Sequence, residues 1–154
     1  MTTVDLSDKA ERVKELMNNL IPFHKTIGLE ATHVDLERVE MSIKMRQDLV
    51  GNPFQRILHG GLIATVLDAT GGMLALMHAL NALGDNPSVE AMEQLKDLGT
   101  IDLRIDYLRP GRGESFVASA YLIRAGSRVS VARMELHNEE GKHIALGTGT
   151  YIVG

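Results

Sequence analysis

The sequence contains no cysteine and no tryptophan, and only three phenylalanines and three tyrosines among its 154 residues. Without cysteine, a disulfide, a thiolate metal site and a cysteine nucleophile are all excluded. With so few aromatic side chains, no aromatic ligand pocket can be inferred. Basic residues form no long run, and acidic residues outnumber them by 20 to 16, so the charge pattern predicts no nucleic-acid partner.

The remaining composition is that of an ordinary globular protein. Hydrophobic residues make up 44% of the chain and charged residues 23%, and the length favours one domain. The N-terminal segment carries acidic residues and lacks an apolar core, so we do not expect a secretory signal. The absence of cysteine is compatible with a reducing compartment, and a cytoplasmic location is expected.

The rest of the chain is organised around residues 59–83, which are apolar or small on nearly every side. This pattern predicts one long helix that is buried on most sides. Asp68 and His78 interrupt it, which favours a core helix over a membrane span. A carboxylate in an apolar helix is unfavourable unless it is paired, and burial raises its pKa. Asp68 is therefore the strongest candidate for function.

Helices and strands are expected on both sides of this segment. Residues 5–20 predict an amphipathic helix with Ser7 as its N-cap, ended by Pro22 and followed by a short crossing segment at 23–29. A loop is expected at 48–55, and Asn86 and Pro87 help to end the central helix. Residues 88–98 are either a short helix capped by Ser88 or a solvated insertion. Period-two alternation predicts two strands within 29–46 and four more at 100–107, 115–124, 128–137 and 143–153.

This order of elements predicts an α+β fold, with a hairpin-connected antiparallel sheet and helices on one face. The sheet should curl around the central helix, because that helix needs cover. One such curl cannot cover so apolar a helix and also leave a substrate channel, so we expect a homodimer, assembled further into a dimer of dimers. No metal site is expected, because the histidines His24, His33, His137 and His143 show no ligand spacing.

Three features together resemble one enzyme family. They are His59-Gly60-Gly61, an acid nine residues after His59, and a strand that runs into Arg109-Pro110-Gly111. Over roughly residues 25–153 the chain resembles the acyl-CoA thioesterases of the phenylacetate-degradation type. That family has the hotdog fold, in which a curled antiparallel sheet wraps one long helix.

The resemblance implies both an organisation and an activity. Residues 1–24 would be an N-terminal helical extension and residues 25–154 the thioesterase domain. The expected reaction is hydrolysis of a small or medium acyl-CoA thioester, with acyl-CoA as the substrate, no separate cofactor and no membrane. The rival hypothesis is a non-catalytic hotdog module that binds acyl-CoA or a partner protein. A hotdog dehydratase needs a differently spaced histidine and acid, which the sequence does not contain.

The resemblance also implies roles for individual residues. The Gly60 N–H polarises the thioester carbonyl, His59 positions the thioester, and Thr100 helps to hold the attacking water. Asp68 either attacks directly, giving an anhydride, or activates water. The expected substrate-binding residues are Asn52 or Gln55 in the preceding loop, Gly61 at the helix start, and Ser127 and Arg128 in a turn that can receive the CoA tail.

Physical reasoning from the residues supports the helix start but leaves alternatives open. Free N–H groups at a helix N-terminus favour negative charge that develops on a carbonyl oxygen, and glycine allows close approach. The two glycines could instead form only a tight turn, His59 could be a helix cap, and Asp68 a structural carboxylate. Arginines 109, 112 and 128 could be solvated. Gly71 and Gly72 cost stability within a helix, about 1 kcal/mol each relative to alanine, which close packing could justify.

The spacing between Gly60 and Asp68 predicts a site shared between two chains. Eight helical residues separate their backbones by roughly 12 Å. A single thioester carbonyl cannot span that distance, even though side chains lean toward the helix N-terminus. We therefore expect Gly60 of one chain to act with Asp68 of another across a two-fold interface.

Overall fold

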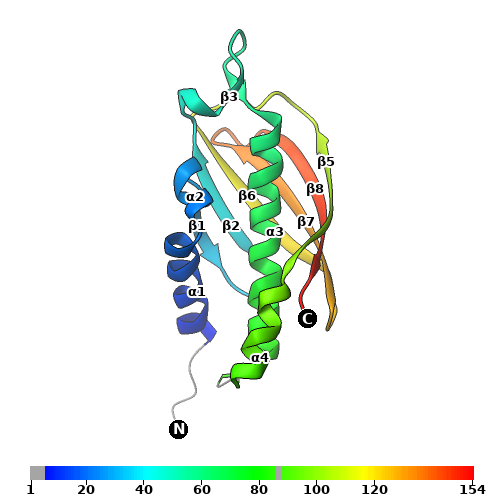
Figure 1. The fold of residues 1–154 in the computed structure, drawn as a ribbon. Coiled ribbons are helices and arrows are strands. Elements are labelled where there is room, and N and C mark those ends of the chain that lie inside the picture. The colour runs from blue at the N-terminus through cyan, green and yellow to red at the C-terminus, as the bar shows by residue number, and fades with distance from the viewer. Residues whose placement is uncertain (1–5, 86–87) are drawn as a thin grey trace.

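A six-stranded antiparallel sheet wraps around one long helix in the computed structural model, which describes residues 6–85 and 88–154 (Figure 1). The helix is α3 (Gly60–Ala82). The strands lie in the order β1 (Glu30–Val34), β2 (Val39–Lys44), β6 (Ser115–Ala125), β7 (Val129–Asn138), β8 (His143–Ile152) and β5 (Gly99–Tyr107). The predicted α+β class and the curled sheet are confirmed.

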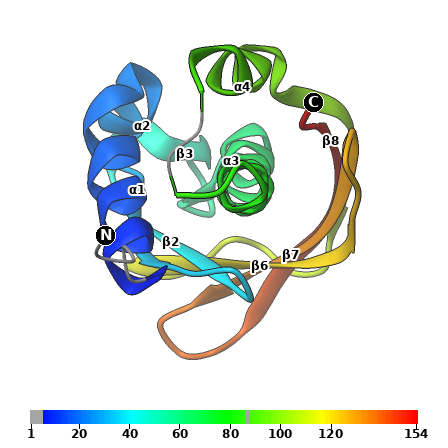
Figure 2. The same cartoon turned by 90° about the horizontal axis from the view of Figure 1, so that it is seen from below.

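The core lies between the sheet and α3. Alternate residues of the central strands face inward, and many of them are small, such as Ala118, Ala120 and Ala132. These alanines let α3 lie close to the sheet, where it contacts β2, β5, β6, β7 and β8. Seen along α3, the sheet curves around one side while the N-terminal helices and α4 (Val89–Glu93) lie on the others (Figure 2).

By length and composition alone, α3 could cross a membrane. It instead packs into the core, as the core-helix prediction required, although burial on nearly every side is wrong for the single chain. One stripe of α3 is only half-buried and includes Thr65, Asp68, Gly72 and Leu76. These positions recur every three or four residues, so they share one face of the helix.

The N-terminal region differs from its prediction in two places. Helix α1 (Leu6–Leu20) already includes Ser7 in its first turn, so Ser7 is not the cap. Pro22 does not leave an irregular crossing segment, because it opens a second helix, α2 (Pro22–Ile27). Proline is well suited to the first helical position. Gly28 ends α2 in the left-handed conformation, with φ 73°. The expected domain boundary after residue 24 falls inside this helix and stays a prediction.

Two further segments have more structure than a loop. Residues 48–55 were expected to be irregular, but the chain forms a 3₁₀ turn, η1 (Gln47–Leu49), and a short hairpin of β3 (Val50–Asn52) and β4 (Ile57–Leu58). In the 88–98 segment, α4 is followed by the 3₁₀ turn η2 (Gln94–Asp97), which agrees with the helical alternative. Asn86 and Pro87, expected to end the central helix, lie outside the described residues.

The two edges of the sheet differ in their cover. At the β1 edge, the Asn18 side chain of α1 accepts a hydrogen bond from the Ala31 N–H at 2.8 Å and donates one to the Ala31 carbonyl at 3.2 Å. At the other edge, β5 is exposed along much of its length, with Ile101 58% and Tyr107 54% exposed. An open edge strand is a template for pairing with another chain.

Candidate active site

The start of α3 leaves the Gly60 N–H without an acceptor among the described residues. His59 is the N-cap, with φ −62° and ψ 133°, and its Nδ1 accepts a hydrogen bond from the Gly61 N–H at 2.9 Å. His59 is therefore a helix cap, which was one of the alternatives that the sequence left open. Among the residues that the structure describes, none accepts a hydrogen bond from the Gly60 N–H. Gly60, and not Gly61, thus has the N–H that can reach a ligand oxygen.

Tyr107 holds this helix start from the end of β5. Its hydroxyl donates to the Gly60 carbonyl at 2.7 Å, and its ring lies 3.5 Å from the position a Cβ on Gly60 would take. The two residues line a hollow of about 360 Å³ whose other wall is the Arg109-Pro110-Gly111 segment. Tyr107 lies in the strand that runs into Arg109-Pro110-Gly111, and the sequence pattern assigned it no role.

Asp68 lies two turns further along α3 and is hydrogen-bonded to Thr100, so the structure brings these two candidate residues together. The Thr100 hydroxyl donates to Asp68 Oδ1 at 2.9 Å. Asp68 is half-buried on the partly open stripe of α3, so the expectation of a carboxylate inside the core is wrong for the single chain. The Asp68 side chain therefore lies on the partly open face of α3, next to the exposed edge strand β5.

Tyr151 supports the same stretch of helix from β8. Its hydroxyl donates to the main-chain carbonyl of Asp68 at 3.1 Å. Burial raises the pKa of Tyr151, and the negative charge of Asp68 raises it further, so the hydroxyl keeps its proton. A Cβ on Gly71 would collide with this hydroxyl and would lie 2.8 Å from Met134 Sδ. Close packing thus explains Gly71, whereas a Cβ on Gly72 would make only an ordinary 3.5 Å contact.

The two amide residues expected to contact the site instead build the loop before it. Asn52 Oδ1 accepts hydrogen bonds from the backbone N–H groups of Phe54 and Gln55, at 3.0 and 3.2 Å. The side-chain and main-chain oxygens of Gln55 accept from Arg112. In the described part of the chain, neither side chain is hydrogen-bonded to Gly60 or Asp68. Arg112 shares a hollow of about 490 Å³ with Arg46 and Arg56, which sequence reasoning missed.

Ser127 and Arg128 lie in the exposed turn between β6 and β7. With Arg124 they line a shallow hollow of about 280 Å³. Ser127 also borders a hollow at the C-terminal end of α3, so the turn and Gly60 lie at opposite ends of that helix. The turn leads into Val129, and Val129 and Gly99 both pair with Ile152. The turn is therefore close to the start of β5, which carries Thr100.

The candidate residues thus form two groups within one chain. His59, Gly60 and Tyr107 make the first, at the start of α3. Asp68 and Thr100 make the second, toward the Ser127 turn. About 12 Å of helix separates the two groups, at roughly 1.5 Å per residue.

A curled antiparallel sheet around one long helix, with candidate polar groups on that helix, defines a hotdog-fold protein. A sequence model of the thioesterase superfamily matches residues 55–145, and the chain belongs to that superfamily. The predicted family resemblance is thereby confirmed.

Individual relatives agree with this assignment. The chain is 43% identical to the medium/long-chain acyl-CoA thioesterase YigI of Escherichia coli K12, over 94% of this chain and 96% of that protein. A crystal structure from Shewanella oneidensis, described as related to the thioesterase superfamily, is 48% identical with a TM-score of 0.90 and covers 99% of this chain and 100% of that one. The PaaI protein of the E. coli phenylacetic acid degradation operon shares the fold, with 20% identity, a TM-score of 0.78, and coverage of 97% and 96%.

Proposed function

We propose that this protein hydrolyses acyl-CoA thioesters to a free acid and CoA. The observation that carries the proposal is the Thr100–Asp68 hydrogen bond at 2.9 Å in a chain whose Gly60 N–H is available to a ligand. The sequence favoured small or medium acyl groups. Because the E. coli relative is named for medium and long chains, we extend the proposed substrates to medium and long acyl groups.

The proposed chemistry needs one oxyanion donor and one carboxylate. The Gly60 N–H donates to the thioester carbonyl oxygen and stabilises the charge that develops there. Thr100 engages Asp68 Oδ1, which orients the carboxylate and leaves Oδ2 for water or for the carbonyl carbon. The hydroxyl oxygen of Thr100 also has lone pairs that can accept a hydrogen bond from that water. In the water route, Asp68 takes a proton from water, the water oxygen bonds to the carbonyl carbon, and the carbon–sulfur bond breaks with the proton passing to the CoA sulfur. In the direct route, the CoA thiolate leaves as the anhydride forms, and water then hydrolyses the anhydride to the free acid.

We propose further that two chains share each site through their β5 strands. Tyr107 contacts Gly60, and Thr100 contacts Asp68. In an antiparallel β5–β5 pair centred between Leu103 and Arg104, Tyr107 of one copy lies opposite Thr100 of the other. This pairing brings the Gly60 end of one chain toward the Asp68 of its partner, twice, across a two-fold axis.

The edges of the sheet favour β5 over β1 for this pairing. Asn18 already satisfies the backbone of Ala31 at the β1 edge, whereas β5 is exposed and apolar at Ile101. Dimer formation would also bury the half-buried stripe of α3. Further assembly into a dimer of dimers, and a cytoplasmic location, belong to the same proposal.

The CoA tail is proposed to dock at the turn of Ser127 and Arg128. Arg124 and Arg128 line the same hollow, and two guanidinium groups suit phosphate oxygens. This turn lies on the Asp68–Thr100 side of the chain, so the tail and the carboxylate would approach the thioester from the same subunit.

The test is release of free thiol from a panel of acyl-CoAs that differ in chain length, followed with a colorimetric thiol reagent. Steady turnover above that of Asp68→Asn, strongest with medium or long chains, supports the proposal. Binding without turnover supports the rival, a non-catalytic acyl-CoA module. The same panel of acyl-pantetheines, which lack the nucleotide, tests the docking turn. Arg128→Ala should raise KM for the acyl-CoAs alone, whereas Arg12→Ala, at an exposed position of α1 outside the proposed site and dimer interface, serves as a surface control.

A further inference from the structure

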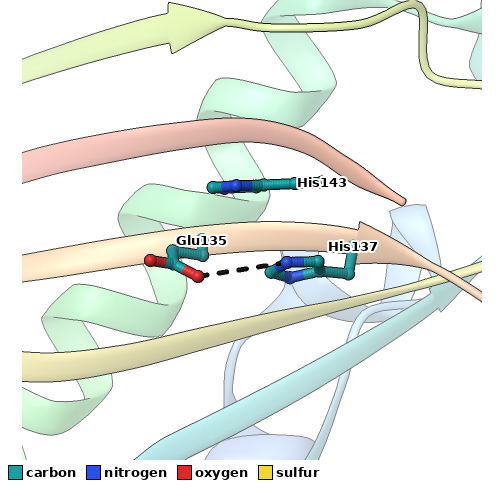
Figure 3. Close-up of side chains that lie close together, drawn as sticks. All are labelled: Glu135, His137 and His143. Atoms are coloured by element: carbon teal, nitrogen blue, oxygen red, sulfur yellow. Dashed lines mark ion pairs between the residues drawn. The ribbon is translucent and has the colours of Figure 1, made fainter. Parts of the chain in front are cut away.

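Three potential metal ligands meet on the outer face of the sheet, away from α3. Glu135 and His137 lie on β7, and His143 lies at the start of β8 (Figure 3). One ligand atom from each residue lies within 4.8 Å of the other two. This cluster is on the opposite side of the sheet from Asp68 and has no part in the proposed hydrolysis.

Strand geometry and one bulge bring the three side chains together. Glu135 and His137 are two residues apart on β7, so they project from the same face. His137 pairs with His143 across the hairpin, and the register shifts between Leu136 and His137. The shift leaves both Ile144 and Ala145 buried in β8 and leaves His143 on the outer face. Bulges of this kind redirect side chains.

Three features of the cluster favour binding of a cation. His137 Nε2 lies 4.0 Å from Glu135 Oε2, and the two imidazole rings are stacked with centroids 4.5 Å apart. His143 Nε2 is buried and, within the described residues, has no hydrogen-bond partner. Among the described residues, no lysine or arginine forms an ion pair with Glu135, and Lys142, next to His143 in sequence, pairs with Glu140. The Glu135 carboxylate thus faces the histidines without a competing lysine or arginine in that part of the chain.

We propose that Glu135, His137 and His143 bind a divalent transition-metal ion such as Zn²⁺. Two imidazoles and one carboxylate are an established donor set for this ion, with a water molecule in the fourth position. Tetrahedral coordination at 2.0–2.1 Å puts ligand atoms about 3.4 Å apart, so atoms that now lie within 4.8 Å of one another must approach by up to about 1.4 Å. The rings are nearly parallel, at 16°, and one of them must turn to aim its lone pair at the metal. His137 and Glu135 are 35% and 37% exposed, which leaves room for that rotation.

A metal in this place would join strands rather than act on substrate. It would fasten the β7–β8 hairpin across the bulge. Arg109 donates a hydrogen bond to the His143 carbonyl at 2.9 Å, and Arg109 also lines the hollow at Gly60. The ion would therefore stabilise the hairpin and, through Arg109, one wall of that hollow.

The test is calorimetric titration of Zn²⁺ into tag-free protein that has been stripped with a chelator. We expect one saturable site per chain, and a rise in melting temperature on addition of Zn²⁺ by mass action. Glu135→Gln, His137→Gln and His143→Gln should each weaken binding at least tenfold. His33→Gln is the matched control, because His33 also faces a carboxylate, Asp35, at 2.7 Å but outside the cluster, and it should bind as the wild type does.

Co²⁺ gives a second measurement that does not depend on stability. Its visible absorption should change on binding to wild type and to His33→Gln, and should not change with His143→Gln. Circular dichroism establishes that each variant is folded. Absence of saturable binding to the wild type, or equal affinity of the wild type and a His137→Gln/His143→Gln double variant, would overturn the proposal.

Discussion

The Thr100 hydroxyl donates a hydrogen bond of 2.9 Å to Oδ1 of Asp68, although the two residues are 32 positions apart in the chain. The bond joins the first residues of β5 to the middle of α3. It engages one oxygen of the carboxylate and leaves the other accessible from the half-exposed face of the helix. Two variants separate the contributions of these residues.

Asp68→Asn preserves the shape of the side chain and removes the base or nucleophile. We expect kcat for acyl-CoA hydrolysis to fall by roughly 10²-fold or more, the scale for loss of a positioned acid–base group. Thiol release under saturating substrate measures this. Retention of more than about a tenth of wild-type turnover would exclude Asp68 from the mechanism.

Thr100→Ala removes one hydrogen bond to a carboxylate that stays in place. A smaller decrease in kcat, of about tenfold or less, is expected because one such bond contributes on the order of 1.5 kcal/mol. Thr100→Ser retains the hydroxyl and should keep most of the activity. A loss as large as that of Asp68→Asn would assign Thr100 a larger role than the one proposed.

Mixed dimers test the shared site directly. Gly60→Pro deletes the proposed oxyanion donor, and proline suits the first helical position after an extended residue such as His59, with ψ 133°. Gly60→Pro and Asp68→Ala proteins should each be nearly inactive. Random mixing on co-expression gives about half mixed dimers, each with one intact site, and returns roughly a quarter of wild-type activity.

The control is a tagged pull-down that establishes that mixed dimers have formed. If they form and activity does not return, then either the site lies within one chain or Gly60 is not the donor. A stable and active monomer, seen by light scattering at micromolar concentration, would contradict the dimer itself.

Two adjacent glycines in α3 should respond oppositely to alanine. A Cβ at position 71 meets the Tyr151 hydroxyl and Met134 Sδ, so Gly71→Ala should lower the free energy of unfolding by about 1–3 kcal/mol. A Cβ at position 72 makes an ordinary contact, so Gly72→Ala should be neutral or raise it by up to about 1 kcal/mol through helix propensity. Urea unfolding at one fixed protein concentration measures both. Equal effects would contradict the packing described for Gly71.

His24 predicts a specific dependence of stability on pH. The side chain is buried and, among the described residues, its Nδ1 has no partner. Burial lowers the pKa of His24 from its ordinary value. As pH falls below about 6.5, the unfolded chain gains this proton before the folded chain does, so the free energy of unfolding decreases down to the folded-state pKa.

His24→Gln should reduce that decrease. The comparison is the free energy of unfolding of wild type and variant at about pH 7.5 and about pH 5.5, above the range in which ordinary carboxylates titrate. A pH dependence that is unchanged in the variant would show that His24 does not cause it.

The long elements of the fold could be predicted because each has a clear period. The strands at 100–107 and 143–153 alternate every two residues, and the long apolar run of α3 predicts a helix, with Asp68 and His78 favouring a core position over a membrane span. The short elements could not be predicted in this way. Pro22 both ends one helix and begins another, and the hairpin of β3 and β4 offers too few residues for a periodic pattern.

The candidate site was predictable to the extent that its residues are close in sequence or belong to a motif. His59 and Gly60 start the helix, and the structure brings Asp68 and Thr100, both named from the family motif, within hydrogen-bond distance. The expectation that Asn52 binds substrate stays a prediction, because its amide can cap a turn as well as bind a ligand and sequence does not distinguish the two. His137 and His143 show no ligand spacing, because only a hairpin and a bulge bring their rings together.

In the proposed dimer, the Asn18 side chain would also limit how many neighbours one chain acquires along its sheet. In the terms of polymer chemistry, a protein with a single open sheet edge is a monofunctional unit, and edge-to-edge growth stops at two. With both edges open the same chain would be bifunctional and would extend into a ladder without a fixed end. By engaging both backbone groups of Ala31, one amide of the N-terminal helix acts as the chain stopper.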